Sequence, residues 1–305
     1  MITVLLAVYN GEKYLREQID SILFQTVKDI KILIRDDGSC DNSLKIIEEY
    51  KARFPETIDV LSGEPTKSAC GNFAELLKAA EGDYFMFCDQ DDVWNPDKIE
   101  KTLRAMRSLE KDFAGPVLVH SDLAVADSTL NIISASFFEY QGLAKSEDRL
   151  SRLLVQNCVT GCTVMINRPL LEKCGDIPNG CAMHDWWLAL VACLFGKIGF
   201  IDRPLILYRQ HGNNQVGAKS AKGIGFIKRK LQDINTVKKN YAATYMQANL
   251  LKERYADSMK EEDLEIINAY CSIPTLCKAK RIKTLRRYGF FKSTRLRILG
   301  QYIFV

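Results

Sequence analysis

The sequence predicts an α/β fold with a mostly parallel central sheet and flanking helices, followed by a helical, basic C-terminal region. Over the first 90 residues, short apolar runs alternate with segments of helical period, as in parallel strands joined by crossover helices. Clusters of polar residues directly follow several of these runs. Charge is unevenly divided, because residues 1–218 hold 23 basic and 31 acidic side chains while residues 219–305 hold 19 and 7.

The elements of the first half follow from the period of the apolar residues. Strand-length apolar runs predict strands, and apolar residues three or four positions apart predict helices. Asp41 or Asn42 can supply the N-cap oxygen of the second helix. Strands are expected at residues 3–8, 30–34, 59–61, 84–88 and 117–120, and helices at residues 13–24, 43–54, 72–80 and 96–109.

The second half is less regular after a polar stretch that follows residue 120. A strand at residues 163–166, a helix at 185–195 and an interrupted apolar run at 200–207 are expected. From Gly223 onward, apolar residues recur at helical spacing. We therefore expect a sheet domain over residues 1–218, divided near residue 115, and a helical region over residues 219–305.

Composition excludes several classes of protein. With 305 residues, 47% apolar and 26% charged, the chain is too long for a lone small module and too apolar for a disordered protein. The opening residues have no basic n-region, and the longest apolar run, residues 186–195, is too short to span a bilayer. Ten cysteines without a secretory signal predict free thiols in a reducing cytoplasm, mostly as small core residues.

Three polar clusters come at the carboxyl ends of predicted strands, where open α/β sheets bind ligands. They are residues 7–11, residues 36–39 and the acidic run Asp89-Gln90-Asp91-Asp92. The second is also an ordinary turn sequence. Three carboxylates within four residues repel one another unless a cation neutralises them, and oxygen ligands suit Mg²⁺ or Mn²⁺. A solvated turn is the alternative for the acidic run.

These residues, with H-D-W-W at His184 and Y-R-Q-H-G-N-N at Tyr208, resemble the inverting, nucleotide-sugar-dependent glycosyltransferases of family 2, which have the GT-A fold. The resemblance covers about residues 1–215. It implies a nucleotide-binding half at residues 1–115, an acceptor-binding half at residues 116–218 and a metal ligand at Asp91. The nucleotide-binding candidates are Ala7, Tyr9, Asp36, Asp37 and Asp89.

The resemblance also implies a catalytic base. The family's base usually lies in an Glu-Asp pair, and His184-Asp185 stands at the corresponding place, so Asp185 is the candidate. An inverting transfer needs one carboxylate to take the proton of the acceptor hydroxyl. The dipole of the following helix lowers the pKa of Asp185, whereas burial beside Trp186 and Trp187 raises it. An N-cap aspartate is the alternative.

The remaining candidates surround the donor and the acceptor. His211 is a candidate second metal ligand, or else a hydrogen-bonded loop residue, and Arg209 is a candidate phosphate contact. A loop at residues 212–214 is expected to order over the donor. Gly161, with His184 and Trp186, is assigned to the donor-sugar or acceptor pocket, because residues 157–163 resemble that segment of bacterial rhamnosyltransferases.

The resemblance favours dTDP-L-rhamnose as donor, with a UDP-hexose as the rival, and a saccharide or lipid-linked saccharide of a bacterial surface polysaccharide as acceptor. Residues 278–297 hold nine basic side chains interleaved with aromatic ones, and no acidic residue follows Glu265. This pattern fits peripheral contact with an anionic membrane at its cytoplasmic face, or else a solvated helix. No recognition module for nucleic acid accompanies the charge. A sugar nucleotidyltransferase and an inactive nucleotide-binding scaffold are the rival functions.

Overall fold

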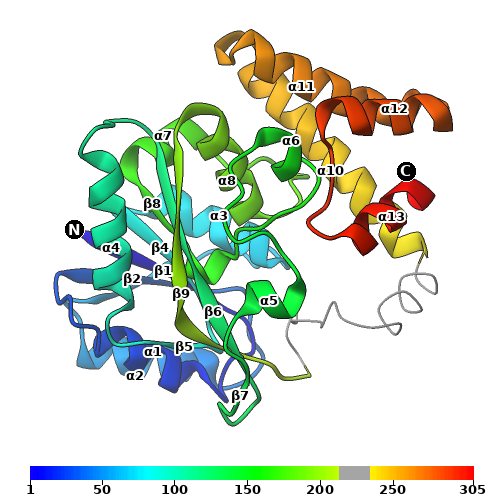
Figure 1. The fold of residues 1–305 in the computed structure, drawn as a ribbon. Coiled ribbons are helices and arrows are strands. Elements are labelled where there is room, and N and C mark those ends of the chain that lie inside the picture. Colours follow the sequence, from blue (N-terminus) through cyan, green and yellow to red (C-terminus); the bar gives the residue numbers. More distant parts are fainter. Residues whose placement is uncertain (213–233) are drawn as a thin grey trace.

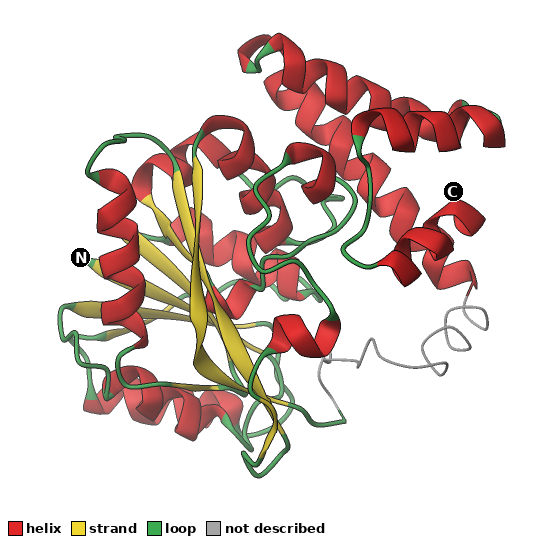
Figure 2. Ribbon diagram, in the orientation of Figure 1, coloured by secondary structure: helices red, strands yellow, loops and turns green. Residues whose placement is uncertain are grey.

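A computed structural model of the chain describes residues 1–212 and 234–305. Its strands form one mixed sheet in the order β3-β2-β1-β4-β8-β6-β9-β5, and β7 pairs with β6. Helices cover both faces of the sheet, and further helices follow at the C-terminal end (Figures 1 and 2). The strands are β1 (Ile2–Val8), β2 (Ile30–Asp36), β3 (Ile58–Val60), β4 (Tyr84–Asp89), β5 (Val93–Trp94), β6 (Val117–Ala126), β7 (Ile132–Ser134), β8 (Met165–Asn167) and β9 (Lys197–Arg209).

The first half is the parallel part of the sheet, as the sequence predicts. β1 lies between β2 and β4 and runs parallel to both, and β3 extends the sheet beyond β2. Because side chains alternate along a strand, Val4 and Leu6 enter the core on one face while Leu5 enters the core on the other. The helices of this half are α1 (Leu15–Leu23), α2 (Ser43–Arg53), α3 (Ala69–Ala79) and α4 (Lys98–Glu110).

The two faces of the sheet are covered by different helices. Apolar residues of α1, α2 and α4 pack on one face, and those of α3 pack on the other. The N-cap expected for α2 is partly different in the structure. Asn42 occupies the cap position, but its side chain donates to Glu12 at 2.6 Å and does not cap the helix, and Asp41 Oδ1 accepts the Ser43 N–H at 2.9 Å.

The second half departs from a purely parallel sheet. β8 is antiparallel to β4 and β6, which joins the two halves, and β6 is parallel to β9. The strand expected at residues 117–120 continues to Ala126. Every residue of β6 is buried, and the polar Asp122 accepts backbone N–H groups of Leu123 and Phe137 at 2.8 and 3.1 Å. A hydrogen-bonded polar residue inside a strand therefore looked like a loop in the sequence.

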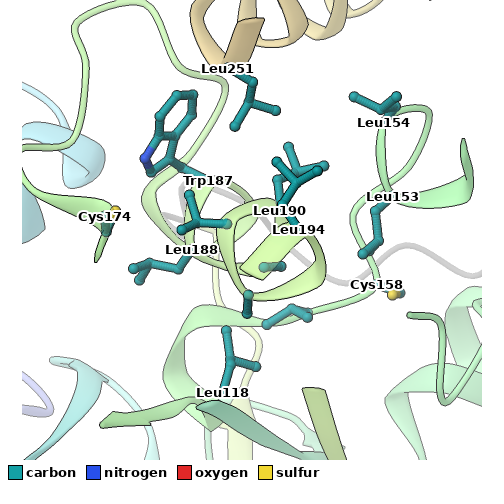
Figure 3. Close-up of a cluster of buried hydrophobic side chains, with 14 of the residues drawn as sticks. Leu118, Leu153, Leu154, Cys158, Cys174, Trp187, Leu188, Leu190, Leu194 and Leu251 are labelled. Atoms are coloured by element: carbon teal, nitrogen blue, oxygen red, sulfur yellow. The ribbon is translucent and has the colours of Figure 1, made fainter. Parts of the chain in front are cut away.

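The helices of the second half surround α8 (His184–Phe195), which is apolar all round and buried for most of its length. Figure 3 shows Trp187, Leu188, Leu190 and Leu194 packed among side chains from neighbouring segments. This packing fixes the N-terminal end of α8, which carries His184 and Asp185. The other elements are α5 (Phe137–Gln141), α6 (Leu150–Leu153), the 3-10 turn η1 (Gly161–Thr163) and α7 (Arg168–Cys174).

The C-terminal helices pack on the sheet domain and share its core. The Tyr255 and Trp187 ring centroids are 6.3 Å apart, and Leu251 lies beside Trp187 (Figure 3). The start expected at Gly223 lies outside the described residues. Across the two described ranges, no helix is both long and apolar enough to cross a membrane. The elements are α10 (Ile234–Tyr255), η2 (Ala256–Ser258), α11 (Glu261–Ser272), η3 (Ile273–Thr275), α12 (Lys278–Tyr288) and α13 (Arg295–Phe304).

Candidate active site

The loops after β1 and β2 are held together by hydrogen bonds between backbone and side chains. The N–H groups of Asn10 and Gly11 donate to Ser39 Oγ and Ser43 Oγ at 2.7 and 2.8 Å. In return, the Asn10 side-chain oxygen accepts the N–H of Cys40 at 2.8 Å. The polar residues that interrupt the apolar pattern here therefore connect two loops that are about 30 residues apart in the chain.

Gln90 connects the first loop to the acidic run. Its side-chain oxygen accepts the N–H of Tyr9, and its amide donates to the Tyr9 carbonyl at 2.7 Å. A Cβ at Gly11 would lie 2.8 Å from Gln90 Cδ, so only glycine leaves room for this bridge. Sequence reasoning missed the role of Gln90, although the residue stands inside the acidic motif.

Four of the predicted nucleotide-binding residues lie along the carboxyl edge of the sheet. Ala7 pairs with Asp89 on one side and with Arg35 on the other, and Val8 pairs with Asp36. Tyr9 follows with 56% of its surface exposed. The structure therefore brings the ends of β1, β2 and β4 together at one edge, as the sequence predicts.

Asp36 and Asp37 have different partners. Asp36 Oδ1 closes a turn by accepting the N–H groups of Gly38 and Ser39 at 3.0 and 2.8 Å. Asp37 is buried and pairs with Arg35 at 3.0 Å. Both carboxylates therefore organise the loop after β2.

Arg35 was missed from the sequence, where it looked like one polar residue in an apolar strand. Its guanidinium is buried and donates to Asp37, to the Asn72 side chain at 3.1 Å and to the Glu64 carbonyl at 2.6 Å. Asp37 in turn accepts the N–H of Thr66 at 2.6 Å. A buried ion pair with this many hydrogen bonds fixes the loop geometry.

In the acidic run, Asp92 is buried and Asp89 is half-buried. Burial raises the pKa of Asp89 to about 7, and the charges of Asp91 and Asp185 act in the same direction. Burial also raises the pKa of Asp92, whose Oδ1 accepts the Arg209 N–H at 3.1 Å. Ligand atoms of Asp89, Asp92 and Cys162 lie within 4.8 Å of one another.

Asp91 and His211 are brought together although 120 residues separate them. Asp91 Oδ2 and His211 Nε2 are 2.7 Å apart, and the two side chains are 13% and 15% exposed. The His211 ring also lies against Tyr14, with ring centroids 4.9 Å apart. A carboxylate oxygen and an imidazole nitrogen at a solvent-accessible point form a donor set that suits Mn²⁺ or Mg²⁺, so these residues fit the predicted metal site.

The guanidinium of Arg209 is bound to other groups of the protein. Its guanidinium donates to the carbonyls of Asp91 and Ser128, both at 2.9 Å, and forms an ion pair with Glu17. It also lies over the Tyr14 ring. Its position therefore gives no support to the expected phosphate contact, and the residue instead holds the acidic run against α1 and β9.

Asp185 lies in the first turn of α8 and is 7% exposed. It accepts hydrogen bonds from the N–H groups of Trp186 and Gly161 and from the Asn157 side chain. Burial outweighs these bonds and raises the pKa of Asp185 to about 7. Of the two opposing effects expected from the sequence, burial is the larger.

His184 is part of the core wall of the site. Its ring lies between Phe73 and Phe87, with centroid distances of 4.2 and 5.1 Å, and burial lowers its pKa to about 3. A Cβ at Gly161 would come within 3.1 Å of His184 Nε2. Trp186 donates its indole N–H to the Leu153 carbonyl at 2.6 Å. His184 and Gly161 thus lie beside Asp185, while the Trp186 indole is bonded to the end of α6.

A cavity of the sheet domain lies away from these residues. It has a volume of about 440 Å³ and lies between the end of β3 and α3. None of the predicted site residues lines it, although Arg35 and Thr66 do. The predicted loop at residues 212–214 lies mostly outside the described residues, since the structure describes only Gly212 of it.

Comparison of the sequence and the fold with known proteins finds similar glycosyltransferases. The sequence profile described as "Glycosyl transferase family 2" matches residues 3–175. Over 243 residues the chain is 32% identical to the dTDP-rhamnosyl transferase RfbG of Shigella flexneri, covering 74% of this chain and 80% of that protein. Over 264 residues it is 29% identical to the putative teichuronic acid biosynthesis glycosyltransferase TuaG of Bacillus subtilis, covering 83% and 97%.

Solved structures share the fold at low sequence identity. The chain superposes on residues 1–349 of S. aureus TarS in complex with UDP-GlcNAc with a TM-score of 0.58 and 16% identity, covering 94% of this chain and 72% of that one. The mannosyltransferase PcManGT from Pyrobaculum calidifontis, in complex with GDP-Man and Mn²⁺, gives a TM-score of 0.52 and 14% identity, covering 94% and 84%. With a family profile matching more than half of its length, the chain belongs to glycosyltransferase family 2 and has the GT-A fold.

Proposed function

We propose that the protein transfers a sugar, with inversion, from a nucleotide diphosphate to a hydroxyl group of a bacterial surface polysaccharide or its lipid-linked precursor. The observation that carries this proposal is Asp185, a buried carboxyl group with a pKa raised to about 7 by burial. Its charge also acts on Asp89, at the end of β4. A proton acceptor therefore adjoins the edge of the sheet where the nucleotide is expected.

In the proposed reaction, Asp185 takes the proton of the acceptor hydroxyl while that oxygen attacks the anomeric carbon of the donor. The new glycosidic bond forms on one face of the sugar as the bond to the diphosphate breaks on the other, which inverts the configuration. A base with a pKa near the working pH is partly ionised and still binds a proton well. Hydrogen bonds from Gly161 and Asn157 hold the carboxylate in position.

Asp91 and His211 are the residues that would hold a Mn²⁺ or Mg²⁺ ion, which supplies positive charge to the leaving diphosphate. Arg209 acts as a positioning residue in this scheme, because it donates to the Asp91 carbonyl. Gln90 joins the same run to Tyr9, a candidate contact for the nucleotide. The metal ligands and the nucleotide-binding loop are thereby connected through the protein backbone.

For the donor we propose dTDP-L-rhamnose. The name of the RfbG relative supports this choice, as does the resemblance of residues 157–163 to rhamnosyltransferases. A UDP-hexose is the second candidate, favoured by the structural likeness to TarS, which was solved with UDP-GlcNAc. The TuaG relative, named for teichuronic acid biosynthesis, supports a cell-surface polysaccharide as the acceptor.

The first experiment compares nucleotides by thermal unfolding. dTDP, UDP and GDP are each added with and without Mn²⁺, because ligand at 100 times its dissociation constant stabilises the folded state by about 2.7 kcal/mol. We expect the largest shift with dTDP and Mn²⁺, and its loss in Asp91→Asn. A larger shift with UDP would change the donor, and no response to any nucleotide would favour the scaffold function.

The second experiment tests the base. Asp185→Asn keeps the size of the side chain but removes its proton-accepting charge, and loss of a general base costs about 10²–10⁴-fold in rate. We expect sugar transfer to fall by that factor while the nucleotide-induced thermal shift persists. Asp127→Asn, which changes a partly exposed carboxyl group directly after the end of β6, is the matched control. Unchanged transfer by Asp185→Asn would overturn the assignment.

We also propose that α12 and α13 contact anionic lipid at the cytoplasmic face of the membrane. Lys280, Lys283 and Arg286 are exposed on α12, and Leu299 and Ile303 are exposed on α13. Exposed cations beside exposed apolar side chains favour an interfacial surface. Co-sedimentation with phosphatidylglycerol vesicles, but not with phosphatidylcholine vesicles, is expected, and charge reversal of Lys280 and Lys283 should weaken it. Equal sedimentation with both vesicles would contradict the proposal.

A further inference from the structure

Two cysteines that are 111 residues apart in the chain meet beside Asp185. The sulfur atoms of Cys70 and Cys181 are 3.4 Å apart, and both side chains are partly buried. The charge of Asp185 acts on both thiols, so the pair adjoins the proposed base. All ten cysteines of the chain are in the thiol form.

Each thiol is held by a well-defined element. Cys70 is in the first turn of α3, whose N-cap Ser68 accepts the N–H of Gly71 at 3.0 Å. Cys181 is in the segment that leads into α8, and the next residue, Ala182, donates its N–H to Gln247 of α10 at 3.0 Å. The two sulfur atoms therefore face each other because two anchored segments meet, one from each half of the sheet domain.

The two thiols differ in reactivity. A hydrogen bond from Cys181 lowers the pKa of Cys70, and the N–H of His184 adds to this effect, while burial and the Asp185 charge oppose it. The N-terminal end of α3 also favours a thiolate at this position. The same hydrogen bond between the two thiols raises the pKa of Cys181, and burial raises it further. Cys70 is thus the better nucleophile for the first step, and Cys181 is the thiol that reacts in the second step.

We propose that Cys70 and Cys181 are a site of reversible oxidation to an intramolecular disulfide, with a small-molecule disulfide such as oxidised glutathione as the oxidant. The Cys70 thiolate attacks one sulfur of the oxidant and releases one thiol, forming a mixed disulfide. The Cys181 thiolate then attacks Cys70, and the second thiol leaves. The protein loses two hydrogen atoms, and the oxidant is reduced to two thiols.

Disulfide formation requires a local movement that bears on the site. A disulfide has a sulfur–sulfur distance of about 2.0 Å, so the two atoms must approach by about 1.4 Å. This movement draws the start of α3 and the segment before α8 together, and each cysteine is three residues away from a member of the Phe73–His184 ring contact. Resting on the proposed function, we infer that the oxidised form has a displaced Asp185 and transfers sugar more slowly.

The other cysteines lack this combination. Cys88, Cys158, Cys162 and Cys174 are buried, and burial raises the pKa of each thiol. Cys277 is exposed, and in the described part of the chain its sulfur atom has no sulfur contact like that of Cys70 with Cys181. We therefore expect oxidised glutathione to form a mixed disulfide at Cys277. We therefore expect Cys70 and Cys181 to form a disulfide with each other, and an exposed single thiol such as Cys277 to form a mixed disulfide with glutathione.

The test uses the full-length protein reduced with dithiothreitol, desalted and incubated with oxidised glutathione. Free thiols are counted with a chromogenic disulfide, and peptides are mapped by mass spectrometry without reduction. We expect a cross-linked peptide pair containing Cys70 and Cys181, removed again by dithiothreitol. Cys181→Ser should instead retain glutathione on Cys70, and Cys277→Ser, the control, should form the cross-link as the wild type does. Glutathione on exposed cysteines without the cross-link would overturn the proposal.

A second readout separates the modification from its consequence. Sugar transfer is measured before and after oxidation in the wild type, in Cys181→Ser and in Cys70→Ser, each checked by thermal unfolding. We expect a loss of at least several-fold in the wild type, restored by dithiothreitol, and no such reversible loss in Cys181→Ser. A cross-link with unchanged transfer would overturn the coupling to Asp185. The thiol count needs no activity, so it stands even if the proposed function fails.

Discussion

Two regions of the molecule are built in opposite ways: the sheet edge proposed to bind the nucleotide, here called the nucleotide edge, and the surroundings of the proposed base Asp185, here called the reaction end. At the nucleotide edge, the loops after β1 and β2 form a network in which Asn10, Asp36 and Asp37 each have several hydrogen-bond partners. At the reaction end, Asp185 is buried, and burial raises its pKa to about 7. In the described part of the chain, neither ring nitrogen of His184 has a hydrogen-bond partner.

This difference indicates how the two regions contribute to function. A network whose polar groups are paired is rigid before any ligand arrives, so it can select a nucleotide without reorganising. Buried carboxyl groups with raised pKa values cost stability, and such groups concentrate at catalytic sites. We therefore expect substitutions at the nucleotide edge to destabilise the fold and some substitutions at the reaction end to stabilise it.

The strongest test of the paired region is Arg35→Met. Removing the guanidinium leaves Asp37 buried without its cation, and breaking a buried ion pair from one side costs about 3–5 kcal/mol. We expect a loss of this size in the free energy of unfolding, measured with urea. Arg16→Met, which breaks the half-exposed pair with Glu49, is the control and should cost about 1 kcal/mol or less. Equal losses in both variants would contradict the comparison.

The strongest test of the reaction end is the stability of Asp185→Asn. The folded-state pKa of about 7 lies above the ordinary value of 3.8, so the unfolded chain ionises first and wild-type stability falls as pH rises between these values. One pKa unit corresponds to about 1.4 kcal/mol, which gives an upper limit of about 4 kcal/mol above pH 7. Asp185→Asn should therefore be more stable than the wild type at pH 8.

The control variant for that test, Asp127→Asn, is expected to change the stability in the opposite direction. Hydrogen bonds from Asn131 and Thr129 lower the pKa of partly exposed Asp127 to about 2. Its contribution to stability is present above the ordinary pKa and is lost as pH falls toward 2. Asp127→Asn should be slightly less stable than the wild type at pH 8. A shared direction of change for Asp127→Asn and Asp185→Asn would refute the contrast between a carboxyl group whose pKa is lowered by hydrogen bonds and one whose pKa is raised by burial.

A smaller effect is expected where the two regions join. In Gly11→Ala the new methyl group displaces Gln90, which breaks its two hydrogen bonds to Tyr9, and overpacking of this kind costs about 1–3 kcal/mol. Nucleotide affinity, measured by calorimetry, should fall with it. Gly300→Ala places a methyl group in open space on α13 and should raise stability by up to about 1 kcal/mol. Unchanged nucleotide binding in Gly11→Ala would show that the Gln90 bridge is dispensable.

The smallest effect is expected for Asn157→Ala. This change removes one hydrogen bond to the Asp185 carboxylate, and such a bond contributes about 1 kcal/mol. Because the bond lowers the pKa of Asp185, its loss should raise that pKa further. The acid limb of the pH profile of kcat/KM should then move to higher pH by less than one unit. A shift to lower pH would exclude Asn157 as a donor to the base.

The elements that the sequence predicted well share a simple apolar period. β1, β2 and β4 are mostly apolar, Asp36 and Asp89 end β2 and β4, and Asp91 follows two residues later, so their common edge could be inferred. The Asp91–His211 contact was also within reach, because the resemblance assigned both residues to one metal site. These features depend on short segments of chain and on strand ends.

The features that the sequence did not predict depend on side-chain direction and on distant partners. Arg35 lies inside an apolar strand, and only the fold shows that Asp37 and Asn72 surround it. The guanidinium of Arg209 could reach a phosphate or a carbonyl, and the position of β9 directs it to Asp91 and Ser128. Residue types alone do not indicate which side chains of distant segments will be in contact in the folded protein.

The pairing of β6 with β9 has a consequence for the order in which the protein assembles during synthesis. β1 to β4 can pair once the first 89 residues have left the ribosome, but β6 pairs with β9, which ends at residue 209. Asp92 and Asp91 gain Arg209 and His211 only at that stage. A nascent chain therefore joins the ends of β1, β2 and β4 early, and its acidic run gains these partners last.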